Sequence, residues 1–128
     1  MKVTIVIARV LLGLAFTIFG ANGLHPFLPQ PPMTGDSGTY FMILFTHHFT
    51  VVIFTVQLNG GLLLLIGRFV PLGLTLLGPV IVNILMFHAL LAPTGYAPAV
   101  VVTVLELFLI WAYRLSFRGL FDAKPEVA

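Results

Sequence analysis

Long apolar stretches alternate along this chain with short segments rich in proline, glycine and polar residues. An apolar run of about 20 residues can cross the hydrocarbon core of a bilayer, and it must be helical because lipid cannot satisfy free backbone groups. Four such runs are present, and they cover approximately residues 4–24, 40–67, 69–91 and 97–117. The pattern therefore predicts an all-α fold, in which residues 1–128 form one domain, an integral membrane four-helix bundle.

The composition agrees with a lipid environment. Hydrophobic residues make up 59% of the chain and charged residues only 8%, whereas soluble domains carry about 25% charged residues. So few charges cannot cover a water-soluble globule, and the lipid bilayer is the expected partner of the surface. The net charge of +2 is too small and too scattered for a nucleic-acid surface. The absence of cysteine excludes thiolate-bound iron–sulfur clusters and disulfides within this chain.

The basic residues indicate which side of the membrane each end of the chain faces. All six Lys and Arg residues lie near the N-terminus, in the 67–71 turn or near the C-terminus. Short cytoplasmic connections are enriched in Lys and Arg, so both termini and this turn are expected in the cytoplasm. The 25–38 and 92–98 connections contain no basic residue and are expected outside. The prediction is an inner-membrane protein with N-in/C-in topology.

Three polar residues fall inside the predicted spans at similar depth. Arg9, Asn59 and Glu106 each lie seven to nine residues from a basic residue near the cytoplasmic boundary, which corresponds to roughly 10–14 Å. Because an unpaired charge inside a bilayer is costly, we expect an intramembrane Arg9–Glu106 pair, formed directly or bridged by Asn59. The pair either fixes the helix register only, or Glu106 handles a proton or polarises a bound head group.

The motif FTHHFT at positions 45–50 places two histidines inside the second apolar stretch. On a helical wheel His48 shares a sector with Thr55 and Asn59, while Thr50 and Gln57 fall on a nearly opposite sector. Periodicity alone does not decide which sector faces inward. We favour the sector of His48, because it extends the polar stripe that leads to Asn59.

A group of polar side chains is expected at the outer end of the bundle, where it can receive a ligand. A quinone head group needs one or two hydrogen-bonding side chains above an apolar slot. The candidate cofactor-binding residues are His88, His48, Asn83 and Asn22. A haem held by His48 and His88 is less favoured, because only their depths match. No metal site is expected, because too few ligands converge. Boundary histidines bonded within the chain are the simpler alternative.

Four segments of the chain resemble the DoxX and DoxX-like family: ARVLLGLAFTIFGANGL (8–24), QLNGGLLLLIGR (57–68), GPVIVNILMFHALLAPTGY (78–96) and ELFLIWAYRLSFRGLF (106–121). The resemblance implies a small four-helix membrane protein from a family linked to thiosulfate:quinone oxidoreductase and other redox systems. It places Arg9, Asn83 and His88 at family-like positions. Many relatives carry Glu in place of Gln57 and Lys in place of Asn22, so thiosulfate oxidation is not transferred to this chain.

The residues and the resemblance together predict a small accessory subunit of a membrane redox complex, next to a quinone or another cofactor. Other membrane subunits are its expected partners, and the chain is not expected to be an enzyme by itself. The alternative is a purely structural or assembly subunit with no ligand of its own. A transporter is less favoured, because the chain has no inverted repeat and only one acid inside the spans.

Overall fold

In the computed structural model, residues 1–29 and 32–128 are described, and they form helices and connecting segments without a strand. The elements are α1 (Lys2–Leu24), α2 (Gly35–Thr46), α3 (Phe49–Ile66), α4 (Val70–Met86), the π-helical turn η1 (Phe87–Leu91), α5 (Ala97–Ala112) and the 3-10 helix η2 (Arg114–Phe121). The expected all-α character is confirmed for this part of the chain.

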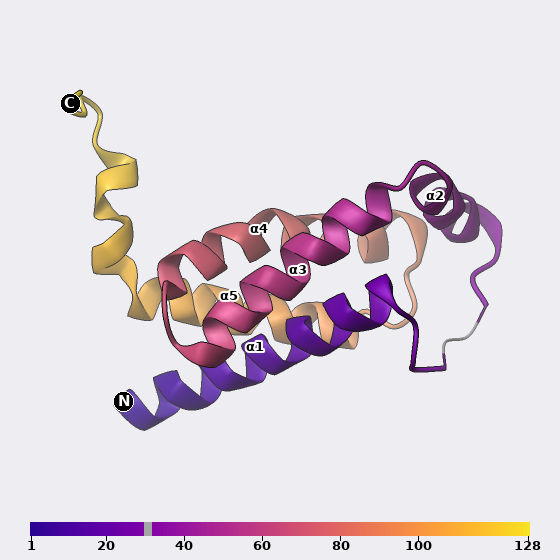
Figure 1. Ribbon diagram of the computed structural model, residues 1–128, viewed down its shortest axis with the longest axis horizontal. Helices are drawn as coiled ribbons and strands as arrows, with labels where there is room; N and C mark the ends of the chain where they lie inside the picture. Colours follow the sequence, from indigo (N-terminus) through magenta and orange to yellow (C-terminus); the bar gives the residue numbers. More distant parts are fainter. Residues whose placement is uncertain (30–31) are drawn as a thin grey trace.

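The four long helices α1, α3, α4 and α5 run along the long axis of the molecule (Figure 1). Both termini lie at one end, and α2 lies at the opposite end, where it is seen nearly end-on across the bundle (Figure 1). Within the described residues, three helical segments are long and apolar enough to cross a membrane: Lys2–Leu24, Phe49–Ile66 and Val70–Leu91. The pair α5 and η2 makes a fourth if this bent pair counts as one span. These helices are compatible with membrane insertion.

The second predicted span, 40–67, is not one continuous helix. Helix α2 ends at Thr46, and α3 begins at Phe49, after His48 takes up a left-handed conformation with φ of 64°. A helix over all of 40–67 would extend roughly 42 Å, which is longer than the ~30 Å hydrocarbon core of a bilayer. The chain breaks at the paired histidines, whose polar rings are best placed at a boundary. Helix α3 alone, at roughly 27 Å, matches the hydrocarbon thickness.

The fourth predicted span, 97–117, is also shorter than expected. Helix α5 ends at Ala112, and η2 continues at an angle of 82° to it. Arg114 is bound at this bend, where its guanidinium lies 4.7 Å from the centroid of the Trp111 ring and donates a 2.8 Å hydrogen bond to the Trp111 carbonyl. A Trp–Arg pair of this kind is typical of the membrane–water interface.

Helices α1 and α3 pack with their backbones in close contact through glycines. A Cβ atom added at Gly13 would lie 2.7 Å from the backbone nitrogen of Leu65, and one added at Gly61 would lie 2.6 Å from that of Thr17. Neither distance is compatible with a side chain, so glycine is required on both faces of this contact. Small residues allow such approach between helices that cannot rely on the hydrophobic effect in lipid.

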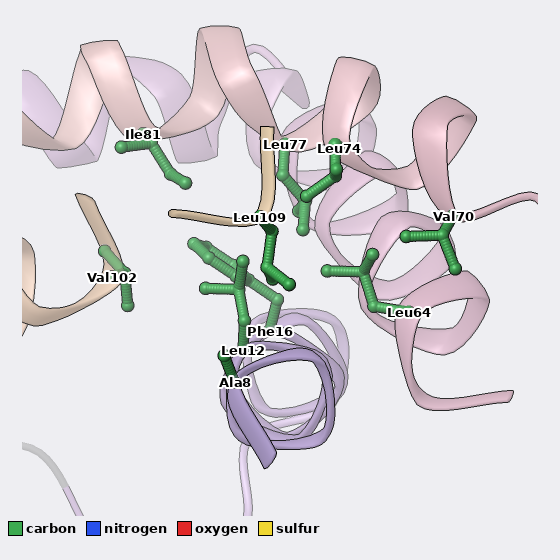
Figure 2. Close-up of a cluster of buried hydrophobic side chains, with 10 residues drawn as sticks. All are labelled: Ala8, Leu12, Phe16, Leu64, Val70, Leu74, Leu77, Ile81, Val102 and Leu109. Carbon is green, nitrogen blue, oxygen red and sulfur yellow. The ribbon is translucent and has the colours of Figure 1, made fainter. Parts of the chain in front are cut away.

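A compact apolar core lies between the four long helices (Figure 2). Its buried residues are Ala8, Leu12, Phe16, Leu64, Val70, Leu74, Leu77, Ile81, Val102 and Leu109. Phe16 and Leu109, which come from α1 and α5, point toward each other near its centre (Figure 2). The outward faces are apolar as well, with Val52 and Leu107 exposed by 65% and 62%. A surface of this kind is suited to lipid rather than water.

Candidate ligand-binding site

A cavity of about 300 Å³ lies at the end of the bundle opposite the termini. It is lined by Phe16, Phe19, Met33, Tyr40, Phe41, Leu44, Thr50, Ile53, Phe54, Gln57, Asn83, Ile84, Phe87, His88, Pro98, Ala99 and Val102. These residues come from all four long helices, from η1, from the segment before α2 and from α2 itself, which covers the end of the bundle. Phe16 and Val102 also belong to the apolar core in Figure 2, so they form the inner wall. The cavity is apolar and aromatic, with a few polar side chains, which is the usual character of a small-molecule site.

Tyr40 and Asn83 form the polar part of the cavity wall between α2 and α4. The hydroxyl of Tyr40 donates a long hydrogen bond of 3.4 Å to Oδ1 of Asn83. The ring of Tyr40 also lies 5.9 Å from that of Phe87, measured between centroids. Accepting through Oδ1 leaves the Nδ2 donors of Asn83 available to a ligand.

His88 lies in the π-helical turn that ends α4. Its Nδ1 is 3.2 Å from the carbonyl oxygens of both Ala92 and Thr94. Carbonyl oxygens only accept, so a neutral imidazole bonded to them carries its hydrogen on Nδ1 and has Nε2 as an acceptor. Its ring packs edge-on against Phe87 with 5.2 Å between centroids. The ring is therefore held by its own loop, and it can accept a hydrogen bond from a hydroxyl group.

The sector of α3 that faces inward is the one that contains Thr50 and Gln57. These two residues are 7% and 6% exposed and line the cavity. His48 is exposed at the break before α3 and does not line the cavity, so our choice of the His48 sector was wrong. The glycine contact with α1 decides the rotation, because Gly61 must face α1 and it lies on the sector of Gln57.

Asn22 stabilises the end of α1 and does not line the cavity. Its Oδ1 accepts hydrogen bonds from the backbone N–H groups of Phe27 and Leu28, at 2.9 Å and 2.8 Å. The side chain is buried and ties the segment after α1 to the end of that helix. Of the four predicted cofactor-binding residues, Asn83 and His88 line the cavity, whereas Asn22 and His48 do not.

The predicted Arg9–Glu106 pair is not formed. The guanidinium of Arg9 donates instead to the carbonyl oxygens of Leu64 and Leu65 in the last turn of α3. These carbonyls lack a donor within their own helix, and the C-terminal end of a helix attracts positive charge. Gly67, with φ of 82°, leaves room for the guanidinium, because a Cβ atom there would lie 2.6 Å from Nη1 of Arg9.

Asn59 does not bridge the pair either. It is exposed, and its amide donates a 2.9 Å hydrogen bond to the carbonyl of Thr55 in the same helix. Glu106 is buried, with 3% of its surface exposed. Neither of its carboxyl oxygens has a hydrogen-bond partner in the described part of the chain. The three residues of the predicted polar layer therefore have three separate environments.

The geometry fits a flat head group better than a haem or a metal ion. His48 and His88 do not converge on the cavity, because only His88 lines it. Across residues 1–29 and 32–128, no group of three or more His, Cys, Asp or Glu side chains could hold a metal ion. The donors on Gln57 and Asn83 could bind carbonyl oxygens, and the aromatic walls could enclose a ring.

Tyr40, Thr50 and Gln57 are polar lining residues that sequence reasoning did not select. Tyr40 was placed at the start of a continuous span, and only the break at His48 turns α2 across the end of the bundle. Gln57 could have been chosen from the glycine pattern, since it shares a helix face with Gly61. Comparison with family models, curated proteins and solved structures finds no match to this chain.

Proposed function

We propose that this chain is a small inner-membrane protein with four spans and both termini in the cytoplasm, which binds a quinone head group in the cavity at its outer end. The observation that carries the proposal is the cavity of about 300 Å³, whose aromatic walls contain the amides of Gln57 and Asn83. A quinone presents two carbonyl oxygens that accept hydrogen bonds and a flat ring that packs between aromatic side chains.

The polar groups of the cavity match this ligand in kind and in number. Gln57 is 94% buried, and it lines the cavity. A buried amide that lacks a hydrogen-bond partner loses about 1–3 kcal/mol, which a ligand oxygen would restore. His88 supplies an acceptor at Nε2, which would suit the hydroxyl of a reduced quinone.

The resemblance to the DoxX and DoxX-like family supports the same proposal at a coarser level. It favours a role beside a membrane redox system, in which this chain acts as an accessory subunit and partner subunits carry out the electron transfer. The exposed apolar faces of α3 and α5 would suit either lipid or a neighbouring subunit. The proposed role requires no catalytic residue in this chain.

A structural subunit without a ligand is the second candidate. It is favoured by the polar residues that the fold itself uses: Arg9 binds the end of α3, and Asn22 binds the segment after α1. In that case the cavity would be a packing defect filled by lipid chains. The two candidates differ in whether a quinone stabilises the purified protein.

The test uses the protein purified in mild detergent and a benzoquinone with a short prenyl tail as the probe. We expect the quinone to raise the thermal unfolding temperature in a saturable way. Gln57→Leu removes one donor from the cavity and should weaken quinone binding roughly fivefold to tenfold.

Asn59→Leu is the matched control. Asn59 lies on the same helix at nearly the same depth, but it is exposed and bonded only to its own helix. Quinone affinity in this variant should stay within about twofold of the unmodified protein. Equal losses of quinone affinity in both variants would reject quinone binding in the cavity and favour the structural candidate. So would the absence of any thermal stabilisation of the unmodified protein by the quinone.

A further inference from the structure

Glu106 is the only acidic residue in the four long helices, and the cavity described above does not include it. Its side chain is 97% buried, and both carboxyl oxygens lie without a hydrogen-bond partner among the residues the structure describes. An isolated carboxylate in an apolar interior is far less stable than the neutral acid. The physical consequence is a carboxyl group that retains its proton.

No positive charge is positioned to change this. Arg9 is the only other charged residue within the long helices apart from Lys2 at the very start of α1. Its guanidinium is held by the carbonyls of Leu64 and Leu65 at the inner end of α3. Its side chain also leans toward the N-terminus of α1, which lies at the end of the molecule away from the cavity (Figure 1).

The position of Glu106 on α5 is about one helical turn beyond Val102, which lines the cavity. Ala99 and Val102 line the cavity, and Glu106 follows them on the same face at spacings of seven and four residues. Its Cα therefore lies roughly 6 Å along the helix from that of Val102. Helix side chains lean toward their own N-terminus, and α5 begins at the cavity end (Figure 1). A side chain that leans in this direction extends toward the cavity end of α5, although Glu106 itself does not line the cavity.

Gln57 approaches the same region from α3. This helix also begins at the cavity end (Figure 1). Its side chains are therefore expected to lean in the same direction as those of α5. Gln57 lies eight residues from the start of α3, and Glu106 lies nine residues from the start of α5. The two residues are therefore at comparable depth and both are buried, and the carboxyl oxygens of Glu106 have no partner in the described part of the chain.

We propose that Glu106 is a proton-carrying group beneath the cavity, and that it donates its O–H to a carbonyl oxygen of the bound head group, beside the amide of Gln57. The first part, that Glu106 carries a proton, stands on the burial of Glu106 alone. The second part, that Glu106 donates a hydrogen bond to the head group, rests on the proposed quinone binding. The head group is then oriented with one oxygen toward the inner wall formed by Phe16 and Val102. The proton is shared in a hydrogen bond, and no bond of the ligand is broken.

Infrared difference spectroscopy of the purified protein tests the proton directly, because a protonated carboxylic acid has a C=O stretch distinct from that of a carboxylate. At neutral pH we expect this band in the unmodified protein and its loss in Glu106→Gln. Glu126→Gln is the matched control, since Glu126 is exposed near the C-terminus, and the band should persist there. Absence of the band from the unmodified protein would overturn the first part of the proposal.

Addition of the prenylated benzoquinone tests the donation. The Glu106 band should move to lower frequency as its O–H becomes hydrogen-bonded. Glu106→Gln retains an N–H donor, so its quinone affinity should stay within about threefold of that of the unmodified protein. Glu106→Leu has no donor, and its quinone affinity should fall roughly fivefold to tenfold. Quinone binding with an unmoved band would reject the donation and leave the proposed function intact. An intact band without any quinone binding would reject the proposed function and the donation, and leave the buried proton in place.

Discussion

At the scale of single residues, the direction in which a helical side chain leans decides where its polar group lies. Arg9 and Glu106 have Cα atoms at similar predicted depth, but α1 and α5 run in opposite directions (Figure 1). Side chains lean toward the N-terminus of their own helix, so the two charged ends move apart along the bundle axis. Arg9 consequently reaches the carbonyls of α3, and the carboxyl oxygens of Glu106 are left without a hydrogen-bond partner in the described part of the chain.

This separation predicts that Arg9 and Glu106 act independently on stability. Arg9→Gln should lower the free energy of unfolding by roughly 1.5–3 kcal/mol, because it removes charged hydrogen bonds to the end of α3. Combined with Glu106→Gln, the two effects should add within about 0.5 kcal/mol. The measurement is a double-mutant cycle from reversible unfolding in detergent. A coupling energy of roughly 1 kcal/mol or more would show that the two side chains interact after all.

At the scale of elements, the break between α2 and α3 has the largest consequence for the site. It leaves α3 just long enough to cross the hydrocarbon core, and it turns α2 across the open end of the bundle (Figure 1). Tyr40 and Phe41 of α2 thereby become part of the cavity wall. A continuous helix over 40–67 would leave that end of the cavity without α2.

The left-handed conformation of His48 makes the break testable, because it decides whether His48→Gly raises or lowers the stability of the protein. His48→Gly should stabilise the protein by roughly 0.5–1 kcal/mol, because glycine adopts positive φ without strain. His47→Gly is the matched control, since His47 has φ of −96° and should lose stability or remain unchanged. Thermal unfolding of both variants is the measurement. In a continuous helix both glycine substitutions would be destabilising. A lower stability of the His48→Gly variant would therefore contradict a helix break at this position.

At the scale of the whole molecule, apolar side chains cover the outside while polar groups gather at the two ends and around one cavity. The termini share one end of the bundle, and α2 lies at the other (Figure 1). This arrangement agrees with an even number of crossings, provided that α5 completes the fourth. The distribution of Lys and Arg then predicts that the end carrying the termini faces the cytoplasm.

The chain contains no cysteine, so single cysteines can report this orientation without background. Ser37→Cys at the start of α2 should react with a membrane-impermeant maleimide in cells whose outer face is accessible. Ala123→Cys near the C-terminus should react only after the membrane is opened. Labelling of both positions from the same side would reject the four-span topology and with it the outer position of the cavity.

The sequence alone determined the helical class and the approximate positions of the apolar segments. These features depend on local composition, because lipid requires apolar side chains and internally bonded backbones. The sequence also selected Asn83 and His88, because their position on one helix near the end opposite the termini can be read from spacing. Their binding of a ligand stays a prediction.

Only the tertiary structure decided which polar groups meet. The rotation of α3, which turns Gln57 inward and Asn59 outward, follows from the backbone contact between Gly61 and Thr17. The partner of Arg9 follows from where α3 ends, and the isolation of Glu106 follows from the antiparallel course of α1 and α5. Each outcome depends on the relative rotation and direction of two helices distant in sequence. Periodicity within α3 hints at its rotation through the face of Gly61, but it carries no information about which groups on other helices this face meets.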